Sequence, residues 1–369
     1  MMRLALASNL APDRRPLSEY GYHLADGLRA AREGDSELVV LSGKHSSATD
    51  SHDVRRVWDY GTPRIPLQII AALRNIRADG LVLNTAFTSW GSNPANLAGL
   101  LTPLLAGRAG FKVGTLLHQI PHTISAARIG YRMTPLHRLA IELGCHAVAT
   151  SHVVYFTLKR DLDVFTKRYR PRRAVQVPHG LLGSRAWCPP PNNRTVLAFG
   201  RWGRGKDPEP LLRVYRSGAD YVGRLVLAGP STPSRPGYVE QLAEEYQSER
   251  ITFTGYVPER DVPSVFHSAD LVVMPYKENA GISGVLHQTC QYGRVPLMRR
   301  LPIFEDMVDE FGLAGYFYDN DEELGSRIGH LLSDPRRLAK DGRQNFEAMR
   351  ALSMDRIGPI YWRLLEDNG

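Results

Sequence analysis

The stretch from Pro275 to Pro296, PYKENAGISGVLHQTCQYGRVP, follows the apolar run Leu271–Pro275 and leads directly into a helix-like segment. Gly281 and Gly284 lack a side chain, so the backbone of this turn can approach a ligand closely. A helix that begins just after a strand also directs several unpaired N–H groups toward any anion placed there. The stretch predicts a parallel α/β unit with an anion-binding turn. The alternative is an ordinary β-to-α connection, in which glycine serves only the turn.

The same strand-and-helix pattern extends over the whole chain, which at 369 residues is longer than one compact core usually supports. Apolar runs that alternate with helix-like stretches are expected to be strands of doubly wound parallel sheets. In the first half these runs are Leu4–Ala7, Glu37–Leu41, Gly80–Asn84, Lys112–Leu117, Ala147–Thr150 and Ala174–Val177. In the second half they are Thr195–Gly200, Arg224–Gly229, Ile251–Gly255 and Leu271–Pro275.

The two halves are separated by GSRAWCPPPNNR at Gly183–Arg194, whose three consecutive prolines cannot continue a sheet or a helix. We therefore expect a Rossmann-like domain at residues 1–183, a linker at 184–194 and a second Rossmann-like domain at 195–344. The remaining residues, 345–369, should hold one long amphipathic helix, Asn345–Leu365, kinked at Gly358–Pro359 and packed back toward the first domain. Two such α/β domains are expected to form a cleft at the carboxyl ends of their strands.

The overall charge is positive, with a formal net charge of +8, which suits anionic ligands or the surface of an anionic membrane. The basic residues do not form one dense run with interleaved aromatic residues but are spread in short clusters such as Arg168–Arg173, so a solvated basic surface is favoured over nucleic-acid binding. No segment has about 18 uninterrupted apolar residues, and no strongly basic amphipathic helix stands out in the first half. We expect a soluble protein for which peripheral membrane contact stays open.

The cysteines also limit the class of protein. Cys145, Cys188 and Cys290 lie far apart and form no CxxC pair, so neither a metal-binding knuckle nor a disulfide framework is indicated. A reducing, cytoplasmic environment fits this usage best. No Asp-x-Asp cluster in a plausible metal-binding setting is found either, so we expect no metal.

A second glycine-bearing loop, FGRWGRGK at Phe199–Lys206, leaves a predicted strand and carries Arg201 and Lys206 five residues apart. A fixed guanidinium and an ammonium can stabilise a diphosphate that leaves as an anion, because they stabilise charge that grows in the transition state. The loop is not a Walker A motif, since Asp207 breaks the GxxxxGK[ST] pattern. A solvated basic loop is the alternative.

Four motifs in this order, FGRWGRGKD, LVLAG at Leu225–Gly229, ITFTGYVPERDVPSVFHSADLVVMPY, and the glycine turn with QTCQYGRVP, resemble the donor domain of glycosyltransferase family 4. These are retaining transferases of the GT-B fold that use nucleotide sugars. The resemblance covers about residues 195–330 well and the first half only in outline. It implies metal-independent transfer from a nucleoside diphosphate sugar, with a UDP-sugar first and a GDP- or dTDP-sugar as alternatives.

The resemblance also implies roles for individual residues. The donor diphosphate and sugar would be bound by Arg201, Lys206, Glu278, Gly281, Ser283, Gly284, Val285 and Leu286, and the nucleobase and ribose by Tyr256, Val257, Pro258 and Gln288. The family usually has two glutamates across this turn, at the positions of Ala280 and Gln288. Neither is a carboxylate here, although Glu278 lies two residues ahead and Gln288 can still accept a hydrogen bond. Sugar recognition is therefore expected to be unusual.

In the first half, VGTLLHQ at Val113–Gln119 is a strand that ends in His118, where the family places an active-site histidine. His118, Arg201 and Lys206 are thus the catalytic candidates; a packed histidine satisfied by a carbonyl is the alternative for His118. His179, in VQVPHG, is expected to line the cleft. Loops on the acceptor side would contribute Ser18, Glu19, Tyr20, His122, Arg128 and Tyr131.

The leading hypothesis is transfer of a sugar to a hydroxyl of a small-molecule or oligosaccharide acceptor, with retained anomeric configuration. A non-catalytic protein that binds nucleotide sugars on the same scaffold is the second, motivated by Ala280 and Gln288. A nucleotide-sugar epimerase or hydrolase of related fold is the third. The sequence leaves the base, the sugar, the acceptor and the oligomeric state open.

Overall fold

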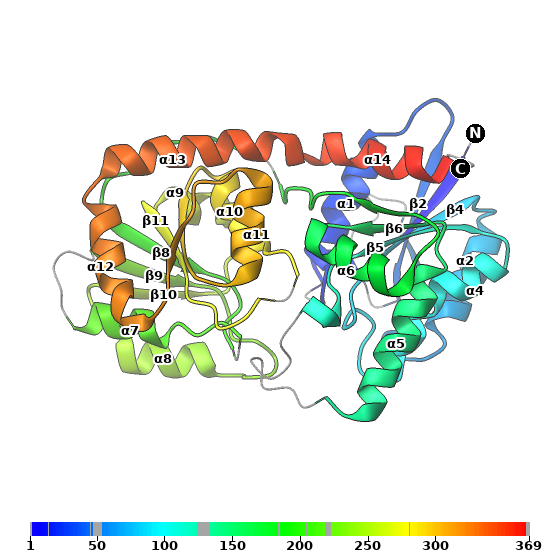
Figure 1. Cartoon of the computed structure of the whole chain (residues 1–369), viewed down its shortest axis with the longest axis horizontal. Helices are drawn as coiled ribbons and strands as arrows, with labels where there is room; N and C mark the ends of the chain where they lie inside the picture. Colours follow the sequence, from blue (N-terminus) through cyan, green and yellow to red (C-terminus); the bar gives the residue numbers. More distant parts are fainter. Residues whose placement is uncertain are drawn as a thin grey trace. The chain divides into compact units, whose positions relative to one another are not determined.

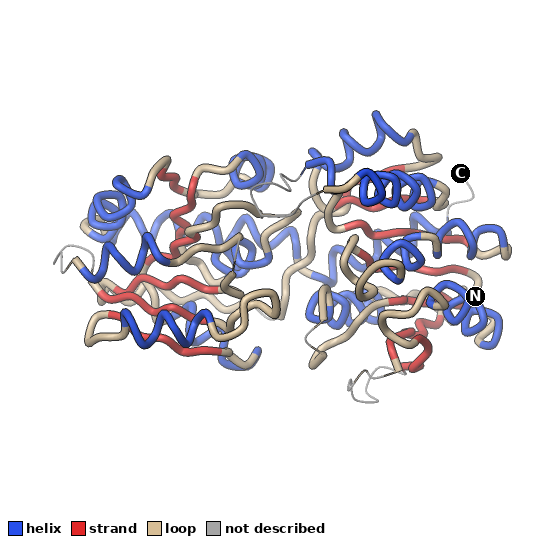
Figure 2. The backbone as a smooth tube through the Cα atoms, turned by 90° about the horizontal axis from the view of Figure 1, so that it is seen from below, coloured by secondary structure: helices blue, strands red, loops and turns tan. Residues whose placement is uncertain are grey.

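The computed structural model describes residues 2–13, 15–44, 46, 54–123, 133–183, 185–203, 205–217, 223–279 and 281–366. The described chain divides into two compact units. The first comprises the described residues up to Gly183 and from Leu352 onward, and the second those from Arg185 to Ala351. In each unit helices flank a sheet of strands (Figures 1 and 2).

The first unit contains a seven-stranded parallel sheet in the order β3-β2-β1-β4-β5-β6-β7. Its strands are β1 (Arg3–Ala7), β2 (Glu37–Gly43), β3 (Val54–Trp58), β4 (Gly80–Thr85), β5 (Lys112–Leu117), β6 (Val153–Phe156) and β7 (Ala174–Gln176). Its helices are α1 (Ser18–Ala30), α2 (Ile65–Asn75), α3 (Ala95–Leu100), α4 (Thr102–Arg108), η2 (Pro121–Thr123), α5 (Pro135–Ala149), α6 (Lys159–Tyr169) and α14 (Met354–Glu366).

The central strands of this sheet are largely apolar because helices cover both faces, whereas the edge strand β3, VRRVW, carries two exposed arginines. Along β1, Leu4 and Leu6 point into a core shared with α1 and α14, whereas Ala5 and Ala7 point into a core shared with α2, α3 and α4. Glycine makes the contact between α1 and α14 close: a Cβ at Gly358 would lie 2.3 Å from the carbonyl oxygen of Gly27. The chain therefore returns to the first unit through α14 (Figure 1).

The second unit contains a six-stranded parallel sheet in the order β10-β9-β8-β11-β12-β13. Its strands are β8 (Thr195–Phe199), β9 (Arg224–Ala228), β10 (Ile251–Gly255), β11 (Leu271–Met274), β12 (Val295–Arg299) and β13 (Tyr316–Tyr318). Its helices are α7 (Glu209–Arg216), α8 (Tyr238–Tyr246), η4 (Glu259–Asp261), α9 (Val262–His267), α10 (Gly284–Gln291), α11 (Pro302–Phe311), α12 (Asp321–Leu332), α13 (Pro335–Ala348) and η5 (Met349–Leu352).

Both sheets reverse their strand order at one point, between β1 and β4 in the first unit and between β8 and β11 in the second. At such a reversal the loops after the two neighbouring strands leave to opposite faces, which opens a crevice outside the carboxyl ends of the strands. Arg201 and Lys206 follow β8 and the glycine turn follows β11, whereas His118 follows β5, the strand next to β4.

Two of the expected elements differ in the structure. The run Ala147–Thr150 is not a strand, because Ala147–Ala149 are the last residues of α5. The strand is instead β6, whose sequence VVYF is rich in residues that favour strands. The expected single helix at Asn345–Leu365 is interrupted by η5, and α14 continues through Pro359. The interruption lies where the chain leaves the core of the second unit and enters that of the first.

Candidate functional site

In the second unit, the loop after β8 and the loop after β11 are held side by side at the switch point. The N–H groups of Lys277 and Glu278 donate to the carbonyl oxygen of Gly205, at 2.9 and 3.2 Å. In return, the N–H of Asp207 donates to the carbonyl oxygen of Pro275 at 3.1 Å. The basic loop and the glycine turn, which the sequence suggested separately, therefore form one surface.

The basic loop is also fastened on its other side, to the end of β9. The Trp202 N–H donates to the carbonyl oxygen of Pro230 at 3.0 Å, and its indole Nε1 donates to that of Ala228 at 3.1 Å. Gly229 has φ of 113°, and a Cβ there would lie 1.7 Å from the carbonyl oxygen of Gly200. Only glycine fits this contact, so the loop that carries Arg201 and Lys206 is rigidly placed.

Lys206 is a partly buried cation. Its Nζ donates to the hydroxyl of Tyr276 at 3.1 Å and lies 4.2 Å from the centre of that ring. Burial, together with the positive charge of Arg201, lowers the pKa of Lys206 to about 8. Within the described chain no carboxylate forms an ion pair with Lys206, and Arg201 is exposed beside it. Such a pair of cations, held by backbone contacts and a neutral phenol, is suited to bind an anion.

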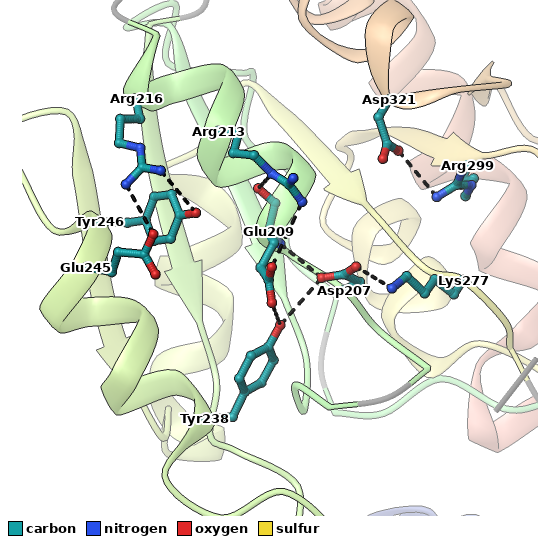
Figure 3. A network of polar contacts seen from close by, with 10 residues as sticks. All are labelled: Asp207, Glu209, Arg213, Arg216, Tyr238, Glu245, Tyr246, Lys277, Arg299 and Asp321. Atoms are coloured by element: carbon teal, nitrogen blue, oxygen red, sulfur yellow. Dashed lines mark hydrogen bonds and ion pairs between the residues drawn. The ribbon is translucent and has the colours of Figure 1, made fainter. Parts of the chain in front are cut away.

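Asp207, the acid next to Lys206 in the sequence, is engaged elsewhere (Figure 3). Its Oδ2 lies 2.6 Å from the Nζ of Lys277, and its Oδ1 accepts from the N–H of Glu209 at 3.2 Å, at the start of α7. The hydroxyl of Tyr238 donates to Glu209 Oε1 at 3.0 Å. Asp207 thus stabilises the start of α7 and pairs with Lys277, which leaves the charge of Lys206 available to a ligand.

The glycine turn leads into α10 as expected from the sequence. Ser283 is the N-cap, and its hydroxyl accepts from the N–H of Leu286 at 3.3 Å. Gly281 has φ of 68°, and the side-chain amide of Asn279 donates to its carbonyl oxygen at 2.8 Å. A Cβ at Gly284 would meet nothing within 4 Å, so the first residue of α10 faces open space. The helix dipole and first-turn N–H groups favour an anion at this end.

The other donor-side candidates lie around this surface. Glu278 is partly buried, and its Oε1 accepts from the N–H of Asn279 at 3.2 Å. Tyr256 is 46% exposed after β10, whereas Val257 packs against the core of the unit. Pro258 directly precedes η4. Within α10, Gln288 is partly buried, and Val285 and Leu286 are buried. Ala280 lies outside the described residues.

In the first unit, His118 ends a buried hydrogen-bond chain that begins at β1. The hydroxyl of Ser8 donates its one hydrogen to the carbonyl oxygen of Asn9 at 2.7 Å, so it accepts from the Nδ2 of Asn84, at 2.8 Å. The Oδ1 of Asn84 therefore faces His118, whose Nε2 lies 2.6 Å away and donates to it. This fixes the Nε2–H tautomer and leaves Nδ1 as an acceptor. Burial lowers the pKa of His118 to about 3, so the ring is neutral near pH 7.

Aromatic rings hold His118 in place. The ring of Tyr20 lies 4.6 Å from that of His118 and 4.2 Å from that of His179, and the two histidines are 5.8 Å apart. Tyr20 is 3% exposed and packs into the core with Leu24 and Tyr361. Tyr20 and His179 thus lie beside the catalytic candidate of this unit, with Tyr20 as part of the core.

The remaining acceptor-side candidates are spread over the unit. Ser18 is buried at the start of α1 and Glu19 is exposed next to it. His122 is engaged away from His118: its Nε2 lies 3.1 Å from Glu142 Oε1 and 3.2 Å from the hydroxyl of Tyr169. Arg128 and Tyr131 lie outside the described residues.

Two residues of these sites were not singled out from the sequence. Tyr276 is the phenol under Lys206, and Asn84 is the amide that orients His118. Tyr276 follows the expected strand Leu271–Pro275, and Asn84 is the last residue of the expected strand Gly80–Asn84. A polar residue at the carboxyl end of a parallel strand is the signal that could have identified them.

Among the described residues, no group of three or more His, Cys, Asp or Glu is arranged to hold a metal ion. In the same part of the chain, no helix has the length and apolar character needed to cross a membrane.

Comparisons with known sequences agree with the arrangement of the second unit. Residues 193–334 match the sequence model of a family described as glycosyl transferases group 1. The D-inositol 3-phosphate glycosyltransferase of Mycobacterium tuberculosis is 35% identical over 136 residues, which are 35% of this chain and 26% of that protein. The same values hold for the Mycobacterium bovis protein. The chain thus spans only 26% of the length of these curated relatives.

Solved structures resemble the whole chain. Sucrose-phosphate synthase from Thermosynechococcus elongatus has a TM-score of 0.73 at 16% identity, covering 99% of this chain and 98% of that one. Anabaena HepE in complex with UDP has a TM-score of 0.72 at 15% identity, covering 99% of both chains. The lipopolysaccharide glycosyltransferase WaaG has a TM-score of 0.68 at 14% identity, covering 99% and 100%. At these identities the likeness concerns the fold, and it confirms the expected α/β class with two Rossmann-like units of GT-B type.

Proposed function

We propose that the protein transfers a sugar from a nucleoside diphosphate sugar to a hydroxyl acceptor, without a metal and with retention of the anomeric configuration. The observation that carries the proposal is the pair of cations on the loop after β8. Lys206 has no carboxylate partner in the described chain, lies beside Arg201, and is fixed next to the glycine turn that starts α10. Two cations on a fixed loop and a helix N-terminus suit a diphosphate that gains charge as it leaves. The match of residues 193–334 to glycosyl transferases group 1 supports the same assignment.

In the proposed reaction, the bond between the anomeric carbon and the diphosphate oxygen breaks, and its electron pair leaves with the nucleoside diphosphate. The acceptor oxygen then bonds to the same face of an oxocarbenium-like sugar, and its proton passes to the leaving phosphate. Arg201 and Lys206 would stabilise the leaving diphosphate. His118 would hydrogen-bond a sugar hydroxyl, because its neutral ring offers Nδ1 as an acceptor.

For the donor we propose a UDP-sugar first. Anabaena HepE, which shares the fold, was solved with UDP and with UDP-glucose. Tyr256, Val257 and Pro258 follow β10 at the same edge of the sheet as Arg201, where they would border the base. A GDP- or dTDP-sugar is the alternative.

For the acceptor we propose a small molecule or an oligosaccharide. The matched curated relatives are named for D-inositol 3-phosphate, and one structural neighbour is a sucrose-phosphate synthase. Phosphorylated polyols and sugars are therefore the first acceptors to test, followed by unphosphorylated ones.

Two single substitutions test the diphosphate assignment. Lys206→Ala removes the ammonium at the switch point, whereas Lys340→Ala removes an exposed ammonium from α13, away from the loops after β8 and β11. Lys206→Ala should abolish the rise in melting temperature that UDP gives to the wild-type protein and lower turnover by about 10²–10³-fold. Lys340→Ala should retain both. Normal nucleotide binding and turnover in Lys206→Ala would refute the assignment.

A second candidate function, binding of nucleotide sugars without catalysis, is favoured by Ala280 and Gln288, which replace the two carboxylates usual in the resembling family. Incubation with UDP-, GDP- and dTDP-sugars and a broad acceptor panel distinguishes the two. Stable binding without transfer or hydrolysis would favour the binding protein. Release of free sugar and nucleoside diphosphate without any acceptor would favour the epimerase or hydrolase.

A further inference from the structure

The basic loop after β8 and the glycine turn after β11 form a short antiparallel bridge, in which Lys206 pairs with Tyr276. The N–H of Asp207 donates to the turn at 3.1 Å, and the N–H of Lys277 donates to the loop at 2.9 Å. These two backbone bonds flank the bridge pair on either side, as in an antiparallel ladder. The bridge therefore sets the register between the loop that carries Lys206 and the turn that leads into α10.

The two faces of this bridge carry different pairs of side chains, because successive residues of an extended segment point to opposite faces. One face holds the bridge pair itself, where the ammonium of Lys206 donates to the hydroxyl of the buried Tyr276. The other face holds Asp207 and Lys277, which are diagonal neighbours within reach of a long side chain. Their Oδ2 and Nζ atoms lie 2.6 Å apart (Figure 3). An ion pair thus lies on the back of the bridge that holds Lys206.

The carboxylate of Asp207 is itself held in place. Its side chain is 14% exposed, and its Oδ1 accepts from the N–H of Glu209 at 3.2 Å. The hydroxyl of Tyr238 on α8 lies 3.4 Å from the same oxygen. The side chain of Lys277, which is 51% exposed, reaches this fixed acid from the other segment of the bridge. The ion pair therefore ties the glycine turn to the start of α7.

We propose that the Asp207–Lys277 ion pair positions the donor-binding loops: it holds the register of the bridge, and thereby the spacing between the ammonium of Lys206 and the N-terminus of α10. A diphosphate that contacts both loops needs this spacing, because charge-assisted hydrogen bonds are short and depend on geometry. Asp207 and Lys277 are thus positioning residues that act through Lys206 and the turn without contacting the ligand. The inference rests on the proposed function, since it concerns the same diphosphate site.

Calorimetry of the full-length protein with UDP and UMP tests this role. Asp207→Asn removes the charge but keeps an oxygen for the N–H of Glu209, and Lys277→Met removes the ammonium but keeps most of the apolar stem. Each variant should lower the affinity for UDP about fivefold, the size expected when a partly exposed ion pair is lost. The affinity for UMP should stay unchanged, because a single phosphate does not need to contact both loops.

The sign of the effect in Asp207→Asn is diagnostic. Removal of a negative charge beside an anion site would by itself strengthen anion binding, whereas loss of a positioning contact weakens it. The double variant Asp207→Asn, Lys277→Met should bind UDP no more weakly than either single variant, because all three lack the same ion pair. Glu245→Gln is the matched control: it breaks the pair of Glu245 with Arg216, 3.2 Å apart between α8 and α7 (Figure 3), and should leave the affinity for UDP unchanged.

The ligand-free variants should melt close to the wild-type protein, because the two backbone bonds of the bridge remain. An unchanged or higher affinity for UDP in Asp207→Asn, equal losses for UDP and UMP, or additive losses in the double variant would overturn the inference. A wild-type protein that does not bind UDP would refute the diphosphate site itself, and the inference with it. Binding of UDP that Lys206→Ala abolishes and Asp207→Asn leaves intact would refute the inference alone.

Discussion

Replacement of Asn84 by aspartate should raise the pKa of His118 by several units. In the wild-type protein burial lowers this pKa to about 3, and the Nε2 of His118 donates to an uncharged amide oxygen 2.6 Å away. In Asn84→Asp the amide becomes a carboxylate, which stabilises the imidazolium. Two unit charges about 4 Å apart at an effective dielectric constant of about 20 interact by about 4 kcal/mol. This corresponds to about three pKa units, so the pKa in the variant should be about 6.

The same substitution should change how stability depends on pH. Because the native ring resists protonation, the unfolded state binds more protons as pH falls below about 6.5, and the native state loses stability until about pH 3. At pH 5 the wild-type protein should therefore be about 2 kcal/mol less stable through His118 than at pH 7.5. In Asn84→Asp this contribution should fall to about 0.6 kcal/mol.

The pKa can be followed by NMR on the full-length protein. Titration of the Cε1–H resonance of His118, assigned with a His118→Gln variant, gives its pKa in both proteins, and nitrogen shifts give the tautomer. Asn96 is a suitable control, because its side chain bonds only backbone groups, at Trp90 and Gly91, and Asn96→Asp should leave His118 unchanged. A wild-type His118 that titrates near 6.5, carries its proton on Nδ1, or ignores Asn84→Asp would refute the hydrogen-bond chain.

Two further predictions concern the second unit. Since the pKa of Lys206 is lowered to about 8, its ammonium is present below that pH and lost above it. The affinity for UDP, measured by calorimetry, should therefore fall above about pH 8, by up to about tenfold per pH unit. This fall should disappear in Lys206→Arg, because the guanidinium stays charged. A Lys206→Arg variant with the same pH profile as the wild-type protein would contradict the role of Lys206 in binding the diphosphate. Arg294 is fully buried and donates to the carbonyl oxygens of Phe266, His267 and Cys188 at 2.9–3.0 Å. Arg294→Met should leave these oxygens unpaired and lower the free energy of unfolding by about 3 kcal/mol or more, whereas exposed Arg336→Met should change it by less than about 0.5 kcal/mol; equal melting temperatures for the two variants would refute it.

The positions of most strands could be predicted from the sequence because buried parallel strands are continuous apolar runs bounded by turn residues. The prediction failed at Ala147–Thr150, where the apolar run is also compatible with the end of a helix. It also missed β3, whose sequence VRRVW carries two arginines, β12, which contains Pro296, and β13, which has only three residues. In these strands the pairing with neighbours outweighs the local pattern.

The sequence by itself determined the class of fold, the cations Arg201 and Lys206 on a loop after a strand, and the resemblance of the second half to a glycosyltransferase donor domain. These features can be read from the order of residues along the chain, because the residues of a loop are identified once the strand and the helix on either side of it are predicted. Only the tertiary structure decided which loops meet. The contacts of Gly205 with Lys277 and Glu278, and of Asn84 with His118 and Ser8, join residues 34 to 76 positions apart in the chain. Strand order sets such contacts, and local sequence patterns do not encode it.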